Sequence, residues 1–187
     1  MPLTVKICGV RDAQTARFCF DHHADYVGLV FAPSRRQVTI EMAQDIVRQT
    51  PGNYVAVVQS PDEADLRDII GSVSVVAIQH HGQARCDWVK ISHQYSLLAI
   101  ASQLDPRADV ALLDGAVPGS GQTRQWQKPT WPKPVWLAGG LSPQNVRSVV
   151  QMLNPEGVDV SSGVEQRGQK DPALIAAFIK EAREWAK

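Results

Sequence analysis

Eight short apolar runs recur along the chain, and most of them are followed by a stretch with the hydrophobic spacing of a helix. The runs begin near Thr4, Tyr26, Tyr54, Val75, Trp88, Val110, Pro134 and Gly157. Strands that alternate with helices are typical of a parallel sheet covered by helices. Eight such units predict a single (β/α)8 (TIM) barrel domain over residues 1–187, with its site at the carboxyl ends of the strands.

Five residues stand where helices are expected to begin. Ser60, Ser142 and Asp171 each precede a proline, the residue preferred at the first helical position. Asp12 and Thr39 precede stretches whose apolar residues recur on one helical face. Short polar side chains at such positions accept hydrogen bonds from the first backbone N–H groups, so each of the five is predicted to cap a helix.

Two connections break the alternation. Only seven residues, 81–87, separate the fourth run from the fifth, fewer than the roughly 10–12 that a helical crossover needs. The helix between strands four and five is therefore predicted to be missing or much reduced, and a helix is expected at about residues 96–104. The segment 115–134 is rich in Gly, Pro and Gln, which predicts a long loop with at most a short helix.

Composition narrows the class of protein. The 187 residues are few for such a barrel, which usually has about 250. Lys and Arg number 19, as do Asp and Glu, and no basic block stands out, which argues against a nucleic-acid partner. Three cysteines do not form a disulfide framework, and no apolar stretch is long enough to span a membrane. We therefore expect a cytoplasmic protein.

Two side chains at strand ends could carry chemistry. Cys8 ends the first run, where a thiolate could act as a base or nucleophile, although a free cysteine is more often a small buried apolar residue. Asp114 ends the sixth run, where it could be a general acid or base once desolvated, or a loop cap.

Loops after the late runs are rich in glycine. Glycine lets backbone N–H groups approach an anion closely, and barrels often bind phosphate with the loops after strands seven and eight. Gly139, Gly140, Ser162 and Gly163 lie in these two loops and are predicted to bind phosphate, although a single glycine pair is more often only a turn. Gly119 and Gly121, in the loop after the sixth run, are also predicted to bind it.

Two further positions bear on ligands. Arg36, after the second run, could clamp a carboxylate with two parallel hydrogen bonds, or be solvated in its loop. The pair His80-His81 could bind a metal, but no spacing of Cys, His or Asp supports a metal site. No metal or other cofactor is predicted.

Seven stretches match the motifs of one family, in the order of that family, and span nearly the whole chain. They are KICG (6–9), ADYVGLVF (24–31), AIQHHG (77–82), LLD (112–114), GSGQT (119–123), AGGL (138–141) and DVSSGVE (159–165). The chain therefore resembles the phosphoribosylanthranilate isomerase family of tryptophan biosynthesis. This resemblance implies an Amadori rearrangement of N-(5-phosphoribosyl)anthranilate to 1-(2-carboxyphenylamino)-1-deoxyribulose 5-phosphate, without a metal or redox cofactor.

The resemblance also implies roles for residues. Cys8 is the general base that removes the C2 proton of the ribose, and Asp114 is the general acid that protonates the ring oxygen. Arg36 holds the anthranilate carboxylate, while His81 and Asp159 contact the substrate. The expected partner is a small phosphorylated substrate, bound by a monomer or a weak homodimer.

The chain departs from the family pattern in places, and alternatives follow. Gln59 stands near the end of run three, where an aromatic residue and an asparagine are usual; His80 replaces a leucine, and Pro118 replaces a glycine.

A related phosphosugar isomerase of histidine biosynthesis, or a bifunctional one, would have an aspartate in place of Cys8. A non-catalytic barrel that binds a phosphorylated ligand is the alternative from another class.

Overall fold

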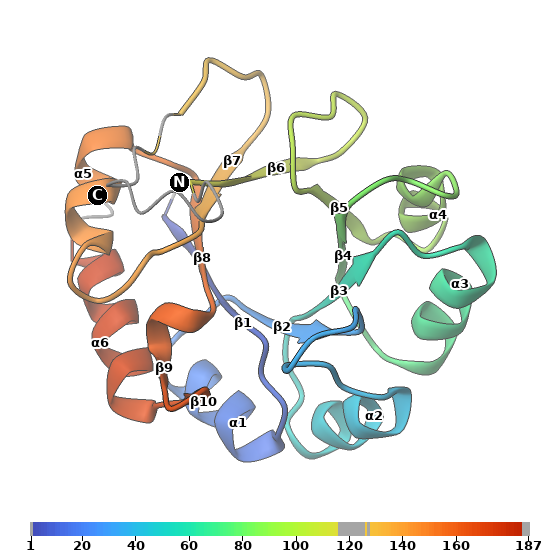
Figure 1. Cartoon of the computed structure of the whole chain (residues 1–187), viewed down its shortest axis with the longest axis horizontal. Coiled ribbons are helices and arrows are strands. Elements are labelled where there is room, and N and C mark those ends of the chain that lie inside the picture. Colours follow the sequence, from blue (N-terminus) through green and yellow to red (C-terminus); the bar gives the residue numbers. More distant parts are fainter. Residues whose placement is uncertain (1, 116–125, 127, 185–187) are drawn as a thin grey trace.

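The computed structural model describes residues 2–115, 126 and 128–184. Eight parallel strands close into a barrel in the order of the sequence, which confirms the predicted fold, and helices surround the barrel (Figure 1). The strands are β1 (Thr4–Cys8), β2 (Tyr26–Val30), β3 (Tyr54–Gln59), β4 (Ala77–His81), β5 (Leu98–Ala101), β6 (Val110–Asp114), β7 (Val135–Ala138) and β8 (Gly157–Val160). The described α-helices are α1 (Ala13–Asp21), α2 (Ile40–Gln49), α3 (Glu63–Ser72), α4 (Trp88–Gln94), α5 (Val146–Leu153) and α6 (Pro172–Arg183).

The end of the chain closes the barrel and adds a small hairpin. β1 pairs with β8, from Thr4 opposite Gly157 to Ile7 opposite Val160. After β8 the chain forms a 3₁₀ turn, η1 (Ser162–Val164), and an antiparallel hairpin of β9 (Glu165–Gln166) and β10 (Gln169–Lys170). The hairpin therefore lies beside the carboxyl end of β1.

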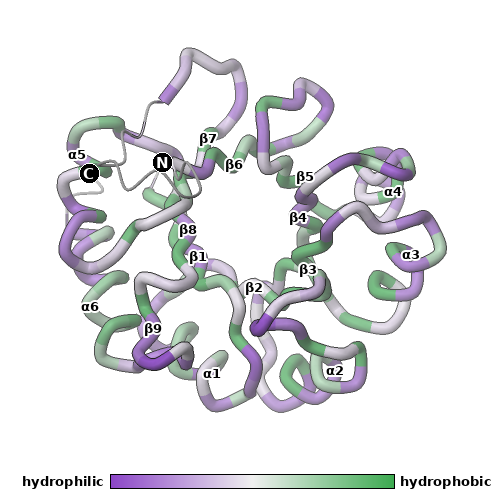
Figure 2. Tube along the Cα trace, viewed as in Figure 1, coloured by the Kyte–Doolittle hydropathy of each residue, from purple (hydrophilic) through white to green (hydrophobic). Residues whose placement is uncertain are grey.

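Alternating side chains on the strands build two apolar layers. One set points into the barrel, among them Val55, Ile100 and Trp136, and the other set packs beneath the helices. Figure 2 shows hydrophobic residues along the strands and hydrophilic segments on the outside. Among the described residues, no helix has the length and hydrophobicity needed to cross a membrane.

Three of the five predicted caps are confirmed. Asp12, Thr39 and Asp171 precede α1, α2 and α6, and each side chain accepts a hydrogen bond from the backbone N–H three residues later. These contacts satisfy backbone donors that the first turn of a helix leaves without partners. The caps are local, which is why the sequence was sufficient to find them.

The other two predicted caps were wrong. Ser60 has a φ of 46°, whereas a cap residue needs extended backbone. Asp62 has that conformation and caps α3 instead, accepting from the N–H of Asp65. After Ser142 the chain first makes a turn, so α5 begins only after Asn145, whose side chain accepts a hydrogen bond from the Ser142 N–H.

The fifth unit of the barrel was misplaced by the prediction. The run that begins at Trp88 is helix α4, and the strand is Leu98–Ala101, within the segment expected to be helical. Trp88 is buried, and its ring stacks on that of His80 in β4, with centroids 5.0 Å apart. The helix between β4 and β5 is therefore present, and its seven residues make it the shortest α-helix of the described chain.

The next connection, between β5 and β6, is fully described and contains no helix. Residues 102–109, all of which are described, join β5 to β6 through turns. The outward-facing side chains of β5 are Ala99 and Ala101, which are small and buried. Little apolar surface on this side of the sheet therefore has to be covered by a helix. Lys133 fixes the loop by donating to the carbonyls of Pro106 and Ala108. In the predicted loop at 115–134, residues 115, 126 and 128–134 contain no helix; the rest lies outside the described residues.

Candidate active site

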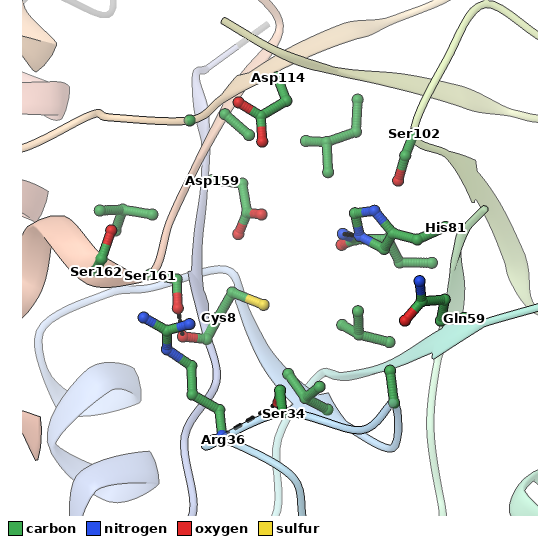
Figure 3. A pocket seen from close by; sticks show the side chains of 18 of the residues that line it. Cys8, Ser34, Arg36, Gln59, His81, Ser102, Asp114, Asp159, Ser161 and Ser162 are labelled. Carbon is green, nitrogen blue, oxygen red and sulfur yellow. Dashed lines mark hydrogen bonds between the residues drawn. The ribbon is translucent and has the colours of Figure 1, made fainter. Parts of the chain in front are cut away.

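A cavity of about 470 Å³ opens at the carboxyl ends of the strands. Every predicted site residue that the structure describes lines it (Figure 3). These residues are Cys8, Arg36, His81, Asp114, Gly139, Gly140, Asp159, Ser162 and Gly163. Gly119 and Gly121 lie outside the described residues.

Cys8 is the last residue of β1, and its Sγ is directed toward the cavity (Figure 3). Its neighbour Gly28 on β2 has no room for a side chain, because an added Cβ would lie 2.9 Å from Cys8 Sγ. Burial raises the pKa of the Cys8 thiol above its ordinary value of 9.0, against the opposing effect of the Lys6 ammonium. The group is therefore a thiol at neutral pH.

Beneath Cys8 lies a buried ion pair that was not predicted from the sequence. Lys6 is completely buried, and its Nζ lies 2.9 Å from Oδ1 of Asp159 on β8. Although burial opposes its charge, the carboxylate of Asp159, and Cys8 once it is ionised, keep the pKa of Lys6 above its ordinary value. The available signal was a lysine in an apolar strand, two residues before the cysteine and so on the same side.

Arg36 is held by Glu165, a second residue without a predicted role. Nε and Nη2 of Arg36 donate to the two oxygens of Glu165, at 2.6 and 2.9 Å. Lys170 Nζ and Arg35 Nη2 also donate to this carboxylate, at 2.9 and 2.8 Å. Burial works against ionisation of Glu165, but Arg36 and Lys170 hold its pKa at about 2. Glu165 is therefore a permanent anion that orients the arginine.

The wall formed by β3, β4 and β5 is polar. Gln79 Nε2 lies 2.7 Å from His81 Nε2, and Gln59 and Ser102 line the cavity nearby (Figure 3). Burial and the nearby Lys6 lower the pKa of His81, so the imidazole is neutral at pH 7. Gln79 Oε1 and Ser102 Oγ are buried and have no hydrogen-bond partner in the described part of the chain. Neither had been predicted, although Gln79 belongs to a matching motif.

The glycine loops after β7 and β8 are packed against each other. Gly139 and Gly140 have φ angles of 76° and 66°, a conformation that favours glycine. A Cβ at Gly163 would lie 1.8 Å from the carbonyl oxygen of Leu141, so a larger residue would separate the loops. Trp126 fixes the first loop by donating to the carbonyl of Gly139. The backbone of both loops therefore reaches the cavity.

Asp114 ends β6 and is exposed at the edge of the cavity, away from Cys8 (Figure 3). The cavity thus holds a thiol and a carboxyl group on different strands, an oriented arginine, and two loops with close backbone access. Such a set defines a (β/α)8-barrel protein that can exchange protons with a small anionic ligand.

Comparisons with known proteins specify the family. A family model described as N-(5'-phosphoribosyl)anthranilate (PRA) isomerase matches residues 5–181. The N-(5'-phosphoribosyl)anthranilate isomerase of Streptococcus pneumoniae (strain Taiwan19F-14) is 38% identical over 96% of this chain and 95% of its own length. The chain belongs to the PRA isomerase family, whose reaction is a step of tryptophan biosynthesis.

Solved structures agree with this assignment. The crystal structure of TrpF from Jonesia denitrificans has a TM-score of 0.84 and 32% identity, and the match covers 97% of each chain. Phosphoribosylanthranilate isomerase from Thermotoga maritima has a TM-score of 0.79 and 30% identity, covering 97% of this chain and 99% of that one. A further phosphoribosylanthranilate isomerase, at a TM-score of 0.77 and 29% identity over 97% and 99% of the two chains, was crystallised with reduced 1-(o-carboxyphenylamino)-1-deoxyribulose 5-phosphate.

Proposed function

We propose that this protein isomerises N-(5-phosphoribosyl)anthranilate to 1-(2-carboxyphenylamino)-1-deoxyribulose 5-phosphate, and that Cys8 and Asp114 carry out the two proton transfers. The observation that carries the proposal is that Cys8, Asp114 and Arg36 share one cavity with the glycine loops after β7 and β8. Family membership and the analogue bound to a similar structure support it. The activity is that of an intramolecular oxidoreductase of the aldose–ketose type.

The chemistry needs one acid and one base. Asp114 gives a proton to the ring oxygen as the C1–O bond breaks, and the nitrogen lone pair forms a C1=N iminium. The Cys8 thiolate then takes the C2 proton, and the C2–H electrons form the C1=C2 bond of an enolamine while the nitrogen becomes neutral. The 2-hydroxyl finally loses its proton while C1 gains one, which gives the ketone with no net change in atoms.

The other residues bind the substrate. Arg36 uses Nε and one hydrogen of Nη2 on Glu165, so its remaining N–H groups are the ones that reach the anthranilate carboxylate. The backbone of Gly139, Gly140, Ser162 and Gly163 binds the phosphate, whose binding energy positions the reacting carbon. His81 and Asp159 contact the sugar between the two ends.

The protein works in the cytoplasm, as a monomer or a weak homodimer. The Thermotoga maritima relative is described as dimeric, and the oligomeric state of this chain is tested by sedimentation at several protein concentrations.

The test of the function follows the loss of anthranilate-type fluorescence as freshly made substrate is converted. Wild type should turn over, and Cys8→Ala should not, while Cys86→Ala serves as the matched control because Cys86 lies outside the cavity. Turnover that survives in Cys8→Ala removes the cysteine from its role as base. The proposed substrate would be refuted by a folded wild type that does not convert it but restores growth of a strain lacking the related isomerase of histidine biosynthesis.

A further inference from the structure

Lys6 is a charged residue in a place where an apolar one would be expected. It lies below the cavity with none of its surface exposed. Its counter-ion, Asp159, is also buried. Replacing a buried ion pair by apolar residues of similar volume often leaves a protein as stable or makes it more stable. Filling the barrel does not by itself account for an ammonium group at this position.

Gly28 places the Lys6 ammonium beside the thiol of Cys8. An added Cβ at Gly28 would lie 2.9 Å from Cys8 Sγ and 3.1 Å from Lys6 Nζ, so both atoms border the same small space. Lys6 and Cys8 are two residues apart on β1 and therefore point to the same side of the strand. A glycine on the neighbouring strand is what allows the two groups to face each other.

Four charged groups face Cys8 from the elements around it. Lys6 comes from β1, Asp159 from β8, Lys170 from β10, and Arg36 from the loop after β2. Lys170 already donates hydrogen bonds to Glu165 and to the backbone of the loop after β8, and Arg36 already donates to Glu165. Lys6 has the strongest favourable effect on the thiolate of Cys8 among these groups.

We propose that Lys6 is a positioning residue for the isomerase reaction: its ammonium, held by Asp159 beside Cys8, stabilises the thiolate that takes the C2 proton. The inference rests on the proposed role of Cys8 as the base. Burial alone would keep the sulfur protonated, because it disfavours the charged thiolate. The fixed ammonium of Lys6, which borders the same space at Gly28 as Cys8 Sγ, offsets part of this unfavourable effect. Lys6 is completely buried, so it acts through Cys8 and Asp159 rather than on the substrate.

The test measures thiolate formation without using turnover. Iodoacetamide reacts with thiolates, and peptide mass spectrometry reports the rate at Cys8 separately from Cys19 and Cys86. In Lys6→Met, the rise of this rate with pH should move to higher pH. Alkylation of Cys8 near neutral pH should then be about tenfold slower or more, because a neighbouring opposite charge favours an ionised group by at least that factor.

A second pair of variants covers the case in which Lys6→Met does not fold, since that change leaves Asp159 buried without its cation. Asp159→Asn and the double variant Lys6→Met/Asp159→Asn differ only in the lysine. The double variant should be alkylated at Cys8 about tenfold more slowly near neutral pH. Equal pH profiles of alkylation within this pair, both proteins being folded, would overturn the proposal.

Turnover of Lys6→Met separates the two proposals. If Lys6 acts through Cys8, the kcat of Lys6→Met should fall along with the alkylation rate of Cys8, while KM changes little, because Lys6 is completely buried and does not line the cavity. Active Cys8→Ala would refute the base, whereas the alkylation shift in Lys6→Met would still report on the ion pair. Conversely, an inactive Cys8→Ala with an unchanged alkylation profile in Lys6→Met would keep the base and refute Lys6.

Discussion

The most direct test of the site's electrostatics is to remove the charge of Glu165. Its side chain is 4% exposed, and its carboxylate is bound by Arg35, Arg36 and Lys170. Replacing it in Glu165→Gln keeps the shape of the side chain but leaves Arg36 and Lys170 without their counter-ion. Breaking a buried pair from one side is costly because the remaining charges have been taken out of water.

The magnitude follows from the pKa of this group. Burial opposes its ionisation, yet Arg36 and Lys170 lower the pKa of Glu165 from 4.5 to about 2. A lowering of this size corresponds to about 3 kcal/mol of folding stability at neutral pH. Because the folded-state pKa is the lower one, the contribution is fully present above the unfolded value of 4.5 and is lost as the pH falls toward about 2.

Urea unfolding of wild type and Glu165→Gln should therefore be compared at about pH 7 and about pH 3. We expect wild type to be more stable by about 3 kcal/mol at the higher pH, and this advantage to shrink by about 2 kcal/mol at the lower pH. Glu63→Gln is the matched control, since its pair with Arg67 on α3 is exposed and contributes roughly 0–1 kcal/mol. An advantage over Glu165→Gln that does not change with pH would refute the electrostatic explanation.

Further predictions concern catalysis. Because burial raises the pKa of Cys8, kcat/KM should increase as the pH rises toward the alkaline range; a pH–rate profile that is flat there would contradict Cys8 as the base. Gly28→Ala should lower kcat with the fold retained by circular dichroism, since the new Cβ displaces Cys8 Sγ; unchanged turnover would show that this spacing does not matter. Asp114→Ala should abolish turnover in a folded protein, and retained turnover would remove it from the role of acid. Arg36→Ala should mainly raise KM, and a drop confined to kcat would count against the carboxylate clamp.

The sequence predicts the barrel well because its signals are local and repeated. Strands β1, β2, β3, β6, β7 and β8 begin at or within one residue of the predicted runs. Confirmed caps such as Asp12 and Asp171 depend on contacts within three residues. Residue types do not show which of several nearby polar residues has the extended backbone of a cap. Ser60 was predicted on its residue type, but its backbone has a positive φ.

The fifth unit shows where an apolar pattern is ambiguous. Trp88, Val89 and Ile91 are all buried, which suits a buried strand as well as a short helix. Tertiary contacts decide between them: the ring of His80 stacks on Trp88, and the N–H of Leu98 donates to the carbonyl of Val76, just before β4. A short apolar run alone does not distinguish the two structures.

The ion pairs of the site are harder to predict than its reactive groups, because they form only when the barrel closes. Cys8 and Asp114 can be found because each ends a strand. Lys6 and Asp159 are 153 residues apart, and Arg36 and Glu165 are 129 apart. Both pairs form because β8 and the hairpin after it return to the side of β1. The electrostatic environment of the Cys8 thiol therefore depends on the closed barrel. A change that loosens the contact between β1 and β8 should alter the ionisation of Cys8 before it unfolds the chain.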